Sequence, residues 1–206
     1  MIDLSQMNGV MVDRDAQRAR AQGGALLGQL DAATLAQGLV TTAGVVSHTG
    51  VGGYTLGGGF GRLNRKYGLT VDNVRGAEII TADGEVRRIS ADQDPDLFWA
   101  IRGGGGNFGV VTEFEYQVYP FDRNVLSGSI VWLMEHARDV LEHYAEAAET
   151  YSDEMYVGPV MAKNPDLGDV IVMDVVYNGD PAEGEKELAA LRAVAPPVVD
   201  GVMVQD

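Results

Sequence analysis

The sequence predicts an α+β fold built from two domains. Strand pairs follow one another along the chain, single helices separate these pairs, and the residue pattern changes after the polar segment 121–124. This order differs from the regular alternation of strand and helix that is typical of a parallel βαβ sheet. We therefore expect one domain over residues 1–124 and a second, incomplete domain over residues 125–206.

The first domain begins with two short strands and a helix. The strands are expected at 10–12 and 18–22, joined by a polar turn. A helix is expected from about residue 25 to 37, and Gly38 stands where a C-cap glycine would. The residues that recur at helical spacing are Leu26, Leu27, Leu30 and Thr34.

A hairpin and a capped helix follow. A short helix at 62–67 ends at Gly68, and strands at 77–81 and 85–89 flank Asp83-Gly84, a strong turn signal. Asp94 and Pro95 then begin a helix, with Asp94 as N-cap. The apolar residues of this helix are Leu97, Phe98, Trp99 and Ile101. A final strand ends at Pro120, and its alternating residues are Val110, Thr112, Phe114, Tyr116 and Val118.

The second domain reads as β-α-β-β-α. Strands are expected at 125–134, 156–162 and 170–177, with a helix at 135–151 after the first and another at 181–194 after the last. This order is a split βαβ layer that lacks its final strand. We therefore expect the chain to be a fragment of a longer protein.

Composition excludes several classes of function. The formal net charge of −15 argues against nucleic acid or an anionic membrane as partner. The chain has no cysteine, so it has no disulfide, thiolate metal site or cysteine nucleophile. The N-terminus does not have the pattern of a signal peptide, so a soluble, cytoplasmic protein is expected.

A glycine-rich stretch, residues 50–61, is the feature around which the chain is organised. Seven of its twelve residues are glycine, and Val51, Leu56 and Phe60 between them argue against a flexible linker. Such a run is useful where the backbone must approach something closely. A bound cofactor and tight packing of turns both meet that description.

Two common phosphate-binding motifs do not fit. Gly104-x-Gly106-x-x-Gly109 has the spacing of a Rossmann fingerprint, but a helix precedes it and a strand follows it, the reverse of what that motif needs. The stretch from Gly52 to Gly57 continues with two glycines where a Walker loop has lysine and a hydroxyl residue. What remains is a pair of loops whose backbone N–H groups could bind a pyrophosphate.

Several motifs together resemble one family. In order, they are Ser47–Gly61, Tyr67–Val74, Thr81–Gly84, Asp96–Gly103 and Gly106–Thr112. Together they resemble the FAD-linked oxidases of the berberine bridge enzyme-like group, in the vanillyl-alcohol oxidase superfamily. The resemblance is strong from about Ile2 to Pro120 and weaker beyond. Several motifs in one order are far more specific than a single glycine loop.

The resemblance implies an FAD-dependent oxidoreductase. Residues 1–124 would be the second subdomain of a PCMH-type FAD-binding domain, and residues 125–206 the start of an α+β substrate domain. The family transfers a hydride from an alcohol, sugar or amine carbon of a small molecule to flavin, usually with oxygen as acceptor. The implied cofactor-binding residues are Gly44, Val46, Ser47, Gly50, Val51, Gly52, Gly53, Tyr54, Gly57, Gly58, Phe60, Gly105, Gly109 and Val110.

The chain also departs from the family pattern. Val46 aligns with the cysteine of members whose FAD is doubly linked, and Tyr54 with a histidine that such members tend to have, so a cysteinyl bond is excluded. The family's histidine-bearing loop would precede Met1, and its catalytic base would follow Asp206. We therefore assign no catalytic residue and expect weak FAD binding or none. The alternative is a non-catalytic protein that keeps the fold as a binding module.

The remaining notable residues have structural explanations. His48 is expected to be held in its loop by hydrogen bonds, and His136 and His143 to lie on a helix surface without a metal. Phe98 and Trp99 are expected in the core, and Asp94 and Asp96 at a helix cap. Tyr54 and Phe60 fit packing between turns as well as flavin contact. Tyr156 fits a half-buried strand position better than a substrate cavity.

Overall fold

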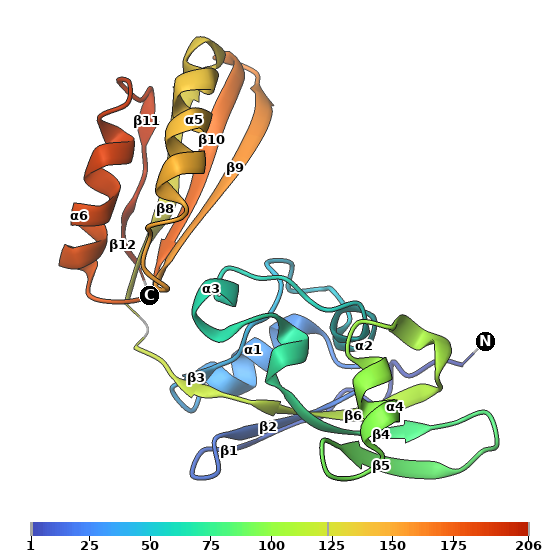
Figure 1. Ribbon diagram of the computed structural model, residues 1–206. Helices are drawn as coiled ribbons and strands as arrows, with labels where there is room; N and C mark the ends of the chain where they lie inside the picture. The colour runs from blue at the N-terminus through green and yellow to red at the C-terminus, as the bar shows by residue number, and fades with distance from the viewer. Residues whose placement is uncertain (1, 123, 206) are drawn as a thin grey trace. The chain divides into compact units, whose positions relative to one another are not determined.

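A computed structural model describes residues 2–122 and 124–205, and it divides the chain into two compact units. Unit 1 is Met1–Phe121 and unit 2 is Asp122–Asp206 (Figure 1). The division lies three residues before the expected boundary. Both units contain antiparallel sheets with helices, so the α+β class is confirmed. The functional assignment of each unit stays a prediction.

Unit 1 contains a five-stranded antiparallel sheet in the order β1-β2-β6-β4-β5. The strands are β1 (Val10–Asp13), β2 (Arg18–Gln22), β4 (Val74–Ile80), β5 (Val86–Ser90) and β6 (Val110–Gln117). All were expected from the sequence, including the β4–β5 hairpin. A separate pair joins β3 (Leu39–Val40) to β7 (Tyr119–Pro120).

Helix α1 (Leu27–Leu35) contributes to the core of unit 1. Its Leu27 and Leu30 are fully buried in one cluster with Phe114 and Tyr116 of β6. Thr34, expected on the same face, is also buried, and its hydroxyl donates to the Leu30 carbonyl. Leu26 precedes the helix and is 39% exposed, so its predicted place on the buried face is wrong.

Helix α4 (Pro95–Ile101) corrects two expectations. Phe98 and Ile101 are buried, but Trp99 is 77% exposed. Residues three apart share a helix face, so a short helix that buries positions 98 and 101 turns position 99 outward. Asp94 occupies the N-cap position in a left-handed conformation, but its side chain makes no capping hydrogen bond. Its carboxylate lies instead 3.5 Å from the guanidinium of Arg87.

The glycine-rich stretch is not only loop. Residues Val51–Leu56 form the short helix α2, with Gly50 as N-cap and Gly57 as C-cap. Helix α3 (Asn64–Tyr67) follows, and Gly68 ends it with a φ of 76°, as expected. Two 3₁₀ turns complete this region, η1 (Thr70–Asn73) and η2 (Gly105–Asn107).

Asn73 links η1 to the end of unit 1. Its fully buried side-chain amide donates to the carbonyls of Tyr67 and Leu69, each at 2.9 Å, and accepts from the Tyr119 hydroxyl at 2.8 Å. The rings of Tyr67 and Tyr119 stack with their centroids 4.2 Å apart. One amide thus fixes the segment after α3 to strand β7.

Unit 2 forms a split βαβ arrangement in which two short strands occupy the fourth position of the sheet. Its elements are β8 (Val125–Leu133), η3 (Met134–His136), α5 (Ala137–Ala147), β9 (Met155–Asn164), β10 (Gly168–Tyr177), α6 (Pro181–Arg192), β11 (Val199–Asp200) and β12 (Met203–Gln205). The order β11-β8-β10-β9 is antiparallel throughout, and β12 also pairs with β8. The expectation of a missing final strand is therefore wrong. The two short pieces supply it.

Helices α5 and α6 pack on one face of this sheet (Figure 1). Val140 of α5 and Leu188 of α6 are fully buried with Ile171 and Met173 of β10. The Trp132 indole N–H, also in this core, donates to the Ala195 carbonyl at 2.8 Å. Within the described residues, no helix is long and apolar enough to cross a bilayer.

Removing the Asn73 amide tests its linking role. We expect Asn73→Ala to lower the free energy of unfolding by about 2–4 kcal/mol, because it leaves buried carbonyls without donors. Asn107→Ala is the matched control, since exposed Asn107 donates one hydrogen bond to the Gly104 carbonyl. Urea denaturation of both variants measures the difference. Equal losses would contradict the linking role.

Candidate flavin site

The glycines of unit 1 fall into two groups, according to whether a Cβ atom added at each one would meet other atoms. A Cβ on Gly52 would lie 2.8 Å from the Gly23 carbonyl oxygen, and one on Gly44 would lie 2.9 Å from the Tyr54 ring. A Cβ on Gly61 would likewise meet the Ala43 carbonyl oxygen, and one on Gly109 would meet the Ile80 carbonyl oxygen. These closed glycines are required by packing alone.

The second group faces open space. A Cβ on Gly50, Gly53 or Gly58 would have no other atom within 4 Å. Gly50 and Gly53 begin helix α2, and the adjoining turn η2 contributes Gly106, which is also open. We call Gly50, Gly53, Gly58 and Gly106 the open glycine strip. A flat ligand could approach the backbone closely along it, because no side chain intervenes.

Exposed apolar side chains occur in the same segments as the strip. Val45 is 65% exposed, Phe60 59% and Phe108 39%, although each belongs to a residue type that is usually buried. A patch of exposed apolar groups is typical of a surface that binds a ligand or another part of a protein. Val45 and Phe108 were not among the predicted site residues, since only their exposure distinguishes them.

The structure brings the predicted cofactor residues of the two glycine segments together, since α2 lies beside η2. Their environments differ. Val51 is fully buried in the core, and Gly44, Gly52 and Gly109 are closed by packing. The predicted residues that are exposed are Val46, Ser47, Gly50, Gly53, Gly57 and Phe60, and those partly buried are Tyr54, Gly58, Gly105 and Val110.

Tyr54 packs between turns. Its ring covers Gly44, and its hydroxyl donates to the Phe60 carbonyl at 2.6 Å. Burial raises the pKa of Tyr54, and the nearby carboxylate of Asp31 raises it further. The phenol therefore stays protonated as a hydrogen-bond donor at neutral pH.

Hydrogen bonds from two threonines hold the glycine stretch in place. The Thr42 hydroxyl donates to the Gly68 carbonyl and the Thr70 hydroxyl to the Thr42 carbonyl, both at 2.9 Å. The backbone N–H groups of Thr70 and Val71 donate at 3.0 Å to the carbonyls of Gly59 and Gly58. The turn after α2 is thereby fixed.

The side of α2 that carries Thr55 is anchored in the core of unit 1. Its buried Thr55 hydroxyl lies 2.7 Å from the Tyr116 hydroxyl, at hydrogen-bonding distance. Tyr116 is itself fully buried in β6, so the contact ties α2 to the sheet. Gly53 lies two residues from Thr55, on the exposed side of the helix that this anchor leaves outward.

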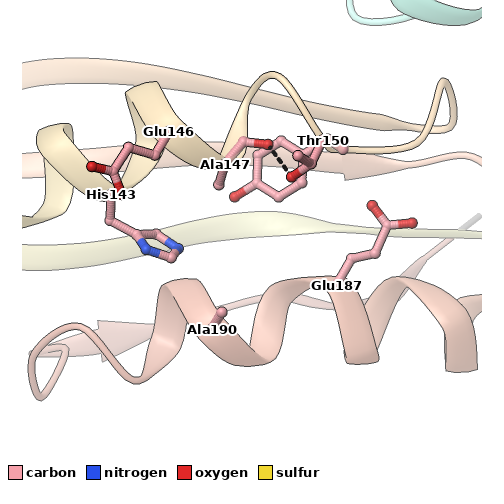
Figure 2. Close-up of a pocket in the computed structure, with 7 residues that line it drawn as sticks. His143, Glu146, Ala147, Thr150, Glu187 and Ala190 are labelled. Atoms are coloured by element: carbon pink, nitrogen blue, oxygen red, sulfur yellow. Dashed lines mark hydrogen bonds between the residues drawn. The ribbon is translucent and has the colours of Figure 1, made fainter.

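A separate pocket of about 420 Å³ lies between α5 and α6 of unit 2 (Figure 2). The His143 ring points from α5 toward α6, with Glu146 and Glu187 at its margins (Figure 2). In the described part of the chain, no group of three or more His, Cys, Asp or Glu side chains could hold a metal ion.

His48, in the loop before α2, is exposed.

The residues present fit a flavin. Its ring is flat and its diphosphate needs donors, so a backbone surface without side chains, bordered by apolar groups, is suitable for both. The open strip and exposed Phe60 supply such a surface. The chemistry of hydride transfer would come from the cofactor, while these residues would bind and orient it.

Comparison with known proteins identifies relatives along the whole chain. Residues 1–90 match the family model described as FAD binding domain. The chain is 35% identical over 207 residues to (R)-6-hydroxynicotine oxidase of Paenarthrobacter nicotinovorans, covering 100% of this chain and 45% of the relative. It is 34% identical over 183 residues to berberine bridge enzyme-like 4 of Arabidopsis thaliana, covering 86% and 34%.

The solved structures agree with these matches. The crystal structure of 6-hydroxy-D-nicotine oxidase from Arthrobacter nicotinovorans matches with a TM-score of 0.90 and 35% identity, over 98% of this chain and 45% of that chain. The expected resemblance to FAD-linked oxidases is confirmed. The chain spans less than half the length of these relatives.

Adjacent glycines of α2 allow a matched test of the two groups. Both Gly52→Ala and Gly53→Ala gain helix propensity of about 1 kcal/mol. We expect Gly53→Ala to raise the unfolding temperature, since its methyl group enters open space. Gly52→Ala should lower it, because its methyl group meets the Gly23 carbonyl. Thermal unfolding by circular dichroism measures both. Equal behaviour would contradict the division into open and closed glycines.

Asp31 of α1 predicts a pH-dependent stability. Burial raises its pKa to about 6, above the value of 3.8 for an ordinary aspartate. The ionised carboxylate therefore destabilises the fold increasingly as the pH rises from about 4 to 6, and fully above that range. Asp31→Asn should remove this penalty, on the order of 2 kcal/mol at pH 7.5 and about half as much at pH 5.0.

Urea denaturation at both pH values measures this gain. Asp15→Asn is the control, because Asp15 lies exposed in the β1–β2 turn and should show no comparable gain. A gain for Asp31→Asn that is the same at pH 5.0 and pH 7.5 would count against the raised pKa.

Proposed function

We propose a function from the premise that residues 1–90 belong to the FAD binding domain family and that the whole chain is homologous to FAD-linked oxidases of the berberine bridge enzyme-like group. Unit 1 is part of the FAD-binding domain, and unit 2 is part of the substrate domain. The protein is an oxidoreductase that takes a hydride from an alcohol, sugar or amine carbon of a small molecule onto FAD, with oxygen as the acceptor.

The observation that carries this proposal is the open glycine strip. Gly50 and Gly53 leave the first turn of α2 bare, while the core holds the other side of that helix through Thr55. Bound flavin supplies hydride acceptance and electron transfer to the acceptor. The strip's role is to bind and orient the cofactor, and exposed Val46 and Phe60 exclude water from the ring.

Two consequences concern the cofactor's attachment and the chain's activity. Val46 carries no thiol, so a cysteinyl bond to FAD from this position is excluded. No catalytic residue could be assigned within residues 1–206, and the relatives are more than twice as long as the chain. We infer that residues 1–206 alone bind FAD weakly and do not turn over substrate.

The alternative is a non-catalytic protein that keeps the fold as a binding or interaction module. The closed glycines, which packing alone requires, support this alternative. The two proposals differ in whether the open strip recognises flavin at all.

FAD titration of the purified chain separates them. We expect quenching of flavin fluorescence with a dissociation constant of roughly 0.1 mM or weaker, together with NMR shifts at the amides of Gly50, Gly53 and Gly58. Gly53→Leu fills open space and should weaken binding at least about tenfold. Ala182→Leu is the control, since Ala182 is an exposed helical residue of unit 2.

Three outcomes would count against parts of the proposal. An absence of shifts at the strip with millimolar FAD would favour the binding module. Tight stoichiometric binding would refute the weak-binding inference. Equal weakening by Gly53→Leu and Ala182→Leu would show that the strip is not the site.

A further inference from the structure

The pocket between α5 and α6 is not used by the proposed flavin function. Its volume is about 420 Å³, and its lining residues all belong to unit 2. Volumes of about 300–1,000 Å³ are usual for small-molecule sites. His143, Ala147 and Thr150 line it from α5 and the turn after that helix, and Glu187 and Ala190 line it from α6 (Figure 2). Since residues three and four apart share a helix face, each helix turns one face toward the pocket.

One buried nitrogen of this lining has no partner in the described part of the chain. The Nε2 atom of His143 is buried and makes no hydrogen bond there. Native proteins rarely keep such an atom, because its lost contact with water destabilises the fold. The Thr150 hydroxyl, in contrast, donates to the Ala147 carbonyl at 3.0 Å. The imidazole nitrogen is therefore a group that a ligand would satisfy.

The charges of the lining favour a cation. Glu146 lies beside His143, and Glu187 lies toward the other end of the pocket (Figure 2). Glu187 accepts from the Ser152 N–H at 3.2 Å, and a carboxylate can accept from further donors. Burial raises the pKa of the Tyr151 phenol, and the nearby Tyr144 and Glu187 raise it further, so the phenol stays neutral. Each end of the pocket thus has one carboxylate.

Two wider features have the same sign. Helix α5 ends at the pocket, and the C-terminal end of a helix carries partial negative charge. Residues 122–206 contain 17 of the chain's 30 acidic residues but only five of its 15 basic residues. The field of unit 2 therefore attracts a cation and repels an anion.

We propose that this pocket is a second ligand site and that its ligand class is a short aliphatic diamine with both nitrogens protonated. One ammonium group donates to the Glu187 carboxylate. The other lies near Glu146 and donates to His143 Nε2, which accepts when the imidazole hydrogen is on Nδ1. The methyl groups of Ala147 and Ala190 contact the carbon chain between the two charges.

Three probes of one length test this proposal on the full chain without flavin. 1,4-Diaminobutane has two ammonium groups, 1-aminobutane has one, and 1,4-butanediol has none. We expect the diamine to shift the amide NMR signals of His143, Ala147 and Glu187. In about 0.15 M salt, which screens long-range attraction, the diol should bind at least about tenfold more weakly. The monoamine should bind roughly fivefold more weakly, as expected for the loss of one hydrogen-bonded end.

Variants at His143 test the second end of the ligand. His143→Phe keeps a ring but removes the nitrogen, so it should abolish most of the diamine's advantage over the monoamine. His143→Gln returns a hydrogen-bonding group and should recover part of it. In the absence of ligand, His143→Phe should unfold at a temperature no lower than the unchanged protein, because a buried polar atom without a partner is gone. His136→Phe, at a histidine outside the pocket, is the control.

A charge variant tests the first end. Glu187→Gln keeps an oxygen that can accept from the Ser152 N–H but removes the charge, so it should weaken both amines about tenfold. Glu149→Gln is the matched control, since Glu149 is exposed, lies outside the lining and carries the same charge. If His143→Phe does not fold, the Glu187 and Glu149 variants still decide the question.

Four outcomes would overturn the diamine proposal. They are equal binding of the three probes, equal weakening by Glu187→Gln and Glu149→Gln, an unchanged diamine advantage in folded His143→Phe, and shifts spread over the acidic surface instead of the pocket. The FAD titration reports on unit 1, so its result neither supports nor contradicts this second site.

Discussion

The hydrogen bonds that join Thr42 to the segment 68–70 are the constraint on which the rest of unit 1's candidate site depends. Each threonine hydroxyl donates to a main-chain carbonyl of the opposite segment, and the backbone N–H groups of Thr70 and Val71 donate to the carbonyls of Gly59 and Gly58. Glycine alone would leave this stretch with many accessible conformations. These hydrogen bonds fix the turn that follows α2. The glycines at the start of the helix are therefore held in one orientation.

Most elements could be predicted because their patterns are local. Alternation in β6 and the Asp-Gly turn of the β4–β5 hairpin are visible over a few residues. Helix α2 was not predicted, since glycine's poor helix propensity argues against it and only the contacts of Thr55 and Gly52 favour it. The final strand of unit 2 was missed because β11 and β12 are too short to show a period.

The site could be predicted in outline but not in detail. The motifs around Gly50–Gly61 indicated flavin through their resemblance to a family, and the comparisons support that cofactor. Sequence could not separate the closed Gly52 from the open Gly53, because the difference lies in the distant Gly23 carbonyl.

The two kinds of glycine in α2 would respond differently to relaxed selection. At Gly52, natural selection for folding alone keeps glycine, whatever the protein does. At Gly53, alanine would be the more stable residue, so a lineage freed from ligand binding should lose that glycine early by mutational drift. In a survey of sequences descended from one ancestor, glycine kept at position 53 would therefore indicate that ligand binding is retained. Glycine kept at position 52 would indicate only that the fold is retained.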